Sequence, residues 1–192
     1  MEGRDIVAKN VFIPAHGGYK NLKSYQMSEI VYDATVKFCE RFINKYSRTT
    51  DQMTQAARSG KQNIAEGSSA SGISKETEIR LIGVARASLE ELLLDYEDYL
   101  RQNGLALWGK DNERVTRVRA LGRQPDRSYT TYKTYIESSP PETAANTILC
   151  LIHQTNYLLD RQLRKLEEDF VKDGGLRERM LKARLNERRK HT

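Results

Sequence analysis

Residues 74–102 read SKETEIRLIGVARASLEELLLDYEDYLRQ, and this stretch decides the fold class. Apolar side chains recur in it at spacings of three and four residues, the period of a helix that buries one face. Ser74 is a favourable N-cap, and Asn103-Gly104 is a typical helix end. The stretch predicts one long helix whose buried seam consists of Ile82, Ala85, Leu89, Leu92, Tyr96 and Tyr99.

The flanking sequence predicts three further long helices, at about 22–46, 51–66 and 141–173. Asp51 is expected to cap the second of these helices, and Gly67 to end it in a left-handed conformation. Four amphipathic helices without a convincing strand predict an all-α protein.

The expected architecture is an antiparallel four-helix bundle over residues 19–170, with an N-terminal arm at 1–18. A link at 104–140, containing one short helix, is inserted between the third and fourth helices. A basic helical extension follows at 171–192.

Composition excludes several classes of protein. The 192 residues contain no apolar run of the length that crosses a bilayer, and we read no secretion signal at the start. The two cysteines, Cys39 and Cys150, lie far apart, which suits a reducing compartment and excludes a cysteine-built zinc site. We therefore expect a cytoplasmic protein without membrane contact, metal or cofactor.

Catalytic signatures are also missing. The sequence lacks GxxxxGK[ST], GxGxxG and HExxH, and none of its three histidines follows a glutamate by three residues. His153 is interpreted as a partly buried, hydrogen-bonded histidine beside an apolar face. No nucleophile–base pair is proposed, so we expect a non-enzyme; a site assembled between subunits is the alternative.

The net charge of +6 is concentrated in two segments. Residues 110–133 carry seven Lys or Arg against three Asp or Glu, and residues 171–192 carry eight against three. A local basic patch favours nucleic-acid binding, although solvated surface is the simpler interpretation.

Arginine and lysine would neutralise phosphates, and tyrosine rings would stack on unpaired bases. Packing of the tyrosines against a neighbouring helix is the alternative. The candidates in the link are Arg114, Arg117, Arg119, Arg123, Arg127, Tyr129, Tyr132 and Tyr135. The candidates in the extension are Lys172, Arg177, Arg179, Lys182, Arg184, Arg188 and Arg189.

The second helix is unusual because its seam, Ala57, Gly60 and Ile64, is small. Glycine in mid-helix costs about 1 kcal/mol relative to alanine. Close helix packing, with Arg58 and Glu66 paired across helices, is the favoured explanation, and a direct ligand role is the alternative.

This segment resembles the signature of a bacterial four-helix-bundle family. The family includes proteins encoded in intervening sequences of 23S ribosomal RNA genes and the accessory variability determinant of diversity-generating retroelements. Leu22-x-x-Tyr25-Gln26 and residues 83–92 agree with it as well. The signature positions are Arg58, Gly60, Asn63, Ile64, Glu66 and Gly67.

The chain departs from the family pattern in three places. Gly60 stands where the family usually has Ile or Val, the link is longer than usual, and residues 171–192 look like the suffix of a longer subgroup. The resemblance implies a homopentamer without catalytic activity, which in one branch binds nucleic acid and a reverse transcriptase.

Two functions follow as expectations. The first is an oligomeric scaffold that binds RNA or DNA, with small-residue helix surfaces, including the second helix, forming the subunit contacts. The second is a protein–protein adaptor whose tail helix docks on a partner. A membrane-surface helix is a weaker third option, because the tail lacks Trp and Phe after Phe170.

Overall fold

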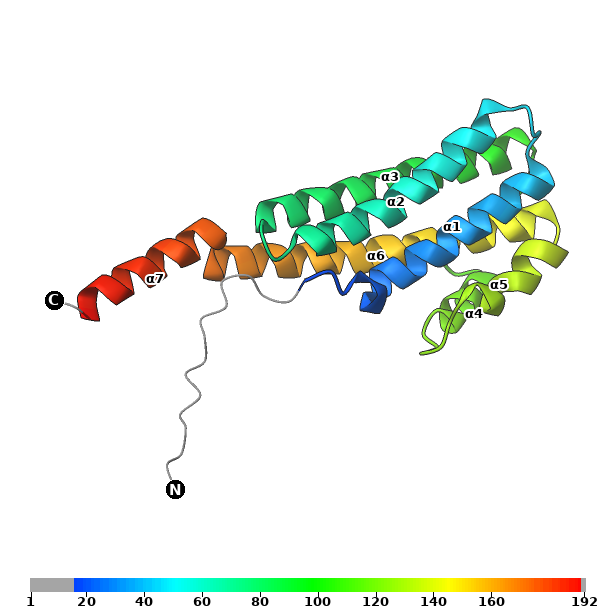
Figure 1. Ribbon diagram of the computed structural model, residues 1–192. Helices are drawn as coiled ribbons and strands as arrows, with labels where there is room; N and C mark the ends of the chain where they lie inside the picture. Colours follow the sequence, from blue (N-terminus) through cyan, green and yellow to red (C-terminus); the bar gives the residue numbers. More distant parts are fainter. Residues whose placement is uncertain (1–15, 191–192) are drawn as a thin grey trace, which may run out of the picture.

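The computed structural model describes residues 16–190, which are helical apart from turns and connections and contain no strand, confirming the all-α class. Four long helices lie side by side, and neighbouring ones run in opposite directions (Figure 1). They are α1 (Lys23–Phe42), α2 (Arg48–Ala70), α3 (Lys75–Gln102) and α6 (Pro141–Asp173), and the 3-10 turn η1 (Tyr19–Asn21) precedes α1.

The link between α3 and α6 folds against the outside of α6. It contains α4 (Glu113–Leu121), α5 (Tyr129–Lys133) and the π-helical turn η2 (Thr134–Ser138). Helix α7 (Leu176–Lys190) projects beyond the end of the long helices (Figure 1). Of the predicted arm, residues 1–15 lie outside the described part, and the Gly17 N–H donates to the Ser68 carbonyl over 3.2 Å.

The core confirms the predicted seam of α3. Ile82, Ala85, Leu89, Leu92 and Tyr96 are fully buried, whereas Tyr99 is half-buried at the edge. The Tyr96 hydroxyl donates to Thr35 Oγ1 of α1 over 3.2 Å, and this hydrogen bond offsets the free-energy cost of removing the hydroxyl from water.

Helix α2 corrects two predictions about its ends. Its N-cap is Ser47, whose hydroxyl accepts from the Thr49 N–H over 3.2 Å, and Asp51 lies in the first turn. The helix continues past Gly67 to Ala70. Gly67 has no positive φ, so it is no left-handed cap. Instead, a Cβ at Gly67 would lie 3.4 Å from the Glu78 carbonyl oxygen, at the limit of ordinary contact, so Gly67 lies directly against α3.

The small seam of α2 is used within the chain. Ala57, Gly60 and Ile64 are buried, and a Cβ at Gly60 would lie only 2.8 Å from the Leu89 side chain. The prediction that these residues form a contact between subunits is therefore wrong, because all three are already buried within the chain.

The polar signature residues of α2 lie at its surface. Arg58 and Glu66 are exposed, and neither makes an ion pair with a residue of 16–190, so the predicted pairing is wrong. Asn63 Nδ2 donates to the Ser59 carbonyl over 2.9 Å, and the Ser59 hydroxyl lies 2.9 Å from that of Ser88 on α3. Small and hydroxyl side chains thus hold α2 close to α3.

The ends of the other long helices follow local chemistry. Helix α1 stops at Phe42, four residues before the predicted end, because the chain turns where Asn44 Oδ1 accepts from the Tyr46 N–H over 2.9 Å. Helix α6 begins with Pro141 in its first turn and ends at Asp173, where the C-cap Gly174 has a φ of +69°.

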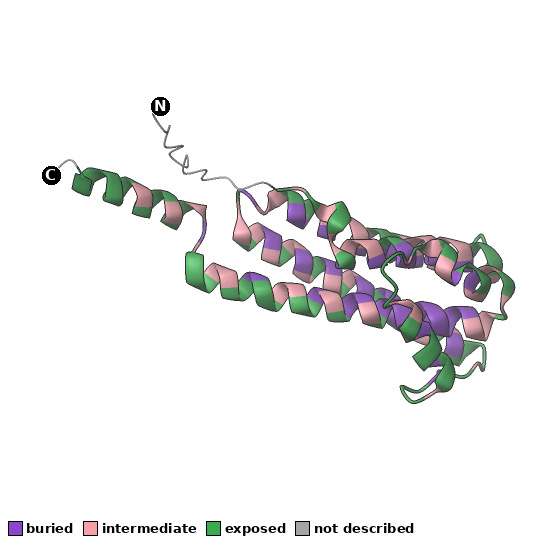
Figure 2. Ribbon diagram, turned by 90° about the horizontal axis from the view of Figure 1, so that it is seen from below, coloured by how far each residue is buried: buried purple, intermediate pink, exposed green. Residues whose placement is uncertain are grey.

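The middle of α6 is buried on all sides, since every residue from 144 to 152 is buried (Figure 2). One face meets the other long helices. The opposite face meets the link, where the Trp108 N–H donates to Asn146 Oδ1 over 2.8 Å and Asn146 Nδ2 donates to the Ala106 carbonyl over 2.8 Å. This fixed docking positions the end of α4 beside α6.

Candidate functional site

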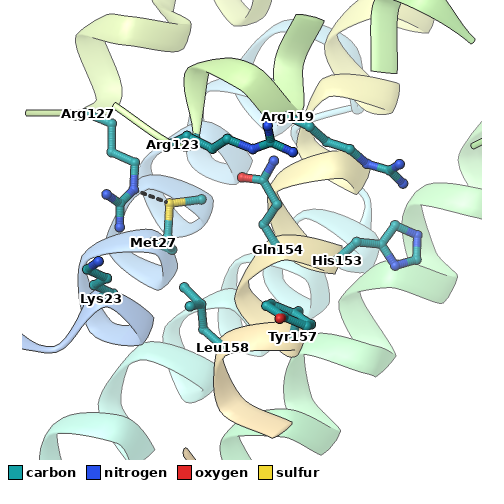
Figure 3. A pocket seen from close by; sticks show the side chains of 10 residues that line it. Lys23, Met27, Arg119, Arg123, Arg127, His153, Gln154, Tyr157 and Leu158 are labelled. Atoms are coloured by element: carbon teal, nitrogen blue, oxygen red, sulfur yellow. Dashed lines mark hydrogen bonds between the residues drawn. The ribbon is translucent and has the colours of Figure 1, made fainter. Parts of the chain in front are cut away.

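A cavity of about 580 Å³ opens where α1, the end of α4 and α6 meet (Figure 3). None of the residues that line it is acidic, and four are Lys or Arg. They are Lys23, Met27, Arg119, Gly122, Arg123, Arg127, His153, Gln154, Tyr157 and Leu158.

Each side of the cavity comes from one element. Arg119 lies in the last turn of α4 and Arg123 just beyond it, while α6 contributes His153, Gln154, Tyr157 and Leu158 at the spacing of one helix face. Gly122 lies against the Gln154 side chain, whose flexible amide end occupies the space that a Cβ at position 122 would take.

The five predicted link arginines fall into two groups. Arg114 and Arg117 are paired with carboxylates, at 3.9 Å from Glu142 and 3.6 Å from Glu113. The other three, which line the cavity, make no ion pair with any residue in the described part of the chain. They are Arg119, Arg123 and Arg127. The cavity therefore keeps its positive charge.

Arg127 is held in place without being neutralised. Its Nε donates to Met27 Sδ over 3.0 Å (Figure 3). Its Nη1 donates to the Gln124 carbonyl over 3.2 Å. A cation fixed by neutral partners loses less conformational entropy when it binds an anion.

The predicted link tyrosines are packing residues. Tyr132 is fully buried, so the prediction that it lies on a binding surface is wrong. Burial raises its pKa to about 12. Its hydroxyl has no hydrogen-bond partner among residues 16–190. Tyr129 is half-buried and donates to Glu137 over 2.8 Å, and burial together with this bond raises its pKa. Tyr135 is also half-buried against the core. The alternative, packing on a neighbouring helix, describes all three.

Tyr157 is the aromatic side chain that the cavity does present, and the sequence analysis missed it. The residue is 59% exposed, and the guanidinium carbon of Arg161 lies 5.9 Å from the ring centroid. Its position in the sequence could have revealed it, because Tyr157 lies off the predicted buried seam of this helix and four residues after His153.

His153 is exposed, which corrects its interpretation as a partly buried histidine. It lines the edge of the cavity one turn before Tyr157 on α6, and its ring is directed away from Met27 and Leu158 (Figure 3). Its imidazole adds a polar group to the rim of the cavity.

The basic tail is a separate surface. No residue of α7 is buried. Of the basic residues predicted to bind nucleic acid in the extension, Arg179 is half-buried and the others are exposed. They are Lys172, Arg177, Lys182, Arg184, Arg188 and Arg189. Helix α6 separates the cavity from α7 by about 24 Å between Tyr157 and Asp173, at about 1.5 Å per residue. The structure does not bring the two basic segments together.

Both cysteine thiols are buried and free, and burial raises the pKa of Cys39 and of Cys150 to about 11. Within residues 16–190, no cluster of three or more His, Cys, Asp or Glu side chains could hold a metal ion. Over the same range, no helix has the length and apolar character needed to cross a membrane.

The chain matches no protein-family model, no curated protein and no solved structure. The family resemblance of its sequence therefore stays a prediction. The chemistry available at the cavity, unpaired cations around an apolar floor, suits binding of an anion.

Proposed function

We propose that the protein is a non-catalytic scaffold that binds RNA or DNA through the cavity between α1, α4 and α6. The observation that carries the proposal is the separation of the link arginines. Arg119, Arg123 and Arg127 remain without carboxylate partners around one cavity, whereas Arg114 and Arg117 are paired. Unpaired guanidinium groups bind phosphates in bidentate geometry without first losing another partner.

The scaffold in this proposal is an antiparallel four-helix bundle of α1, α2, α3 and α6. Assembly into a homopentamer, and a reverse transcriptase as partner, remain part of the proposal on the strength of the sequence resemblance. Any subunit contact must use a surface other than Ala57, Gly60 and Ile64, which are buried within the chain. A cytoplasmic location agrees with the two free thiols.

The test compares two double variants of equal charge change, R119Q/R123Q at the cavity and R114Q/R117Q on the paired side. Binding of a labelled oligonucleotide is measured by fluorescence anisotropy between about 50 and 200 mM salt. Two lost phosphate contacts should lower the log–log salt slope by about 1.4 on single strands and about 1.8 on duplex.

The control pair should change the slope less, because a carboxylate lies within 3.9 Å of each of its side chains and competes with a phosphate. Equal effects of the two pairs would show that only net charge matters. No effect of either pair would remove the cavity from nucleic-acid binding.

A protein–protein adaptor remains the second candidate, and one observation favours it. Met180, Leu181 and Leu185 of α7 are 45–57% exposed, although they are apolar. Replacing Leu181 and Leu185 with Ser should abolish adaptor binding to a partner protein and leave oligonucleotide binding intact, because the net charge of α7 does not change.

A further inference from the structure

The cavity offers more than positive charge, and its floor indicates what kind of anion it takes. Leu158, half-buried on α6, supplies apolar atoms that a ligand can cover, whereas Met27 beneath the rim is 1% exposed and already covered. A bare phosphate gains no binding free energy from apolar atoms, whereas a planar base gains binding free energy when it removes them from water. The volume of about 580 Å³ lies within the usual range of small-molecule sites.

Tyr157 supplies an aromatic surface at the same place. Figure 3 shows Tyr157 and Leu158 on the α6 side of the cavity, and Arg119 and Arg123 on the α4 side. With 59% of its surface exposed, Tyr157 has a face available to a ligand, unlike the buried Tyr132. Stacking on tyrosine is a general way to bind a base irrespective of its identity.

Gln154 lies between these two sides (Figure 3), and its side-chain amide makes no hydrogen bond within residues 16–190. An amide offers a donor and an acceptor, which match the edge of a base that has lost its pairing partner. Cations, an aromatic ring and a free amide thus surround one apolar floor.

We infer that the cavity holds one unpaired base of a single-stranded nucleic acid, stacked on Tyr157, while Arg119, Arg123 and Arg127 bind phosphates beside it. This inference rests on the proposed function and specifies its ligand. A duplex reaches the rim arginines only with its phosphates, because its bases remain paired and stacked. An acidic peptide satisfies the arginines but leaves the floor and the ring unused.

The test uses a short labelled oligonucleotide as a single strand and as the matching duplex, with full-length protein. Y157L removes the ring and keeps apolar volume, and Y157F keeps the ring. Tyr46, which is 84% exposed between α1 and α2, gives the matched control Y46L. Thermal melting of each variant checks that it is folded.

Y157L should weaken single-strand binding about 5- to 150-fold, the effect of losing one stacked base. Duplex binding should stay within about twofold, and Y157F and Y46L should bind both forms as the parent does. The salt slope of Y157L should not change, because no phosphate contact is lost.

If Y157L weakens neither form while R119Q/R123Q weakens both, the inference fails and the proposed function stands. If Y157L weakens both forms equally, the cavity does not select unpaired bases and the inference also fails. If no variant has an effect, both fail. Displacement of the single strand by polyglutamate as readily as by unlabelled oligonucleotide would assign the cavity to acidic peptides instead.

Discussion

Gly60 permits the closest approach between α2 and α3, and replacing it with alanine tests that packing. A Cβ at this position would lie 2.8 Å from both Cγ and Cδ2 of Leu89. Ordinary contact begins near 3.4 Å, so Leu89 must move by about 0.6 Å or more, and it is fully buried. Because Cγ is the branch point of the leucine, rotation of a terminal methyl cannot relieve the clash.

The magnitude follows from two opposing effects. Alanine in mid-helix gains about 1 kcal/mol over glycine, and overpacking of a core costs about 1–3 kcal/mol. G60A should therefore lower the free energy of unfolding by about 0–2 kcal/mol. Gly83 in α3 is the matched control, because nothing lies within 4 Å of its Cβ position; G83A should gain up to about 1 kcal/mol.

The difference between the two variants isolates overpacking, about 1–3 kcal/mol, which corresponds to about 2–12 °C in melting temperature. Circular dichroism melts and urea titrations measure it. In an L89A background the added methyl fills vacated space, so G60A should become stabilising. A G60A protein as stable as G83A, or an effect that is the same with and without Leu89, would refute the close contact.

Four other outcomes are expected. G67A should keep or raise stability while G67V lowers it, because the Cβ fits at 3.4 Å but further methyl groups do not; a left-handed cap would penalise both. Y132F should be as stable as the parent or up to about 1–3 kcal/mol more stable, because an unpartnered hydroxyl is removed. The parent should lose stability as the pH rises above 10, because Tyr132, with its pKa raised to about 12, stays protonated in the folded state but ionises on unfolding. Y132F should show a smaller loss over the same pH range, because it lacks this hydroxyl. Cys39 and Cys150, with pKa values of about 11, should be about 0.1% thiolate at pH 8 and react with a disulfide reagent only after unfolding. Deleting residues 174–192 should leave the melting temperature unchanged, because α7 buries no side chain, and sedimentation should show the same oligomer; a lower oligomer would mean that α7 clamps subunits together.

Sequence periodicity and capping chemistry were sufficient for α3 and α6, since Ser74, Pro141 and Gly174 mark ends that depend only on local backbone groups. Gly67 was misread because a glycine at a helix end and a glycine at a helix contact have the same sequence signal. The distinction depends on the distance to α3, which is a tertiary property.

The site was predicted in part. The arginines were found from local charge. The pair between Arg117 and Glu113 is four residues apart within α4 and is local, whereas the pair between Arg114 and Glu142 depends on docking of the link on α6. Tyr157 was missed because its cationic neighbours, Arg119 and Arg123, are more than thirty positions away in the sequence.

The docking of the link on α6 also determines which residue types α6 can carry on its outer face. Leu149 and Cys150 are 3% and 5% exposed because the link covers them, and both would face water in a shorter protein. The apolar character of these two positions therefore depends on the presence of the link. A relative without the link is expected to carry polar or charged side chains at both positions, and its α6 would be an amphipathic helix with one face exposed to solvent.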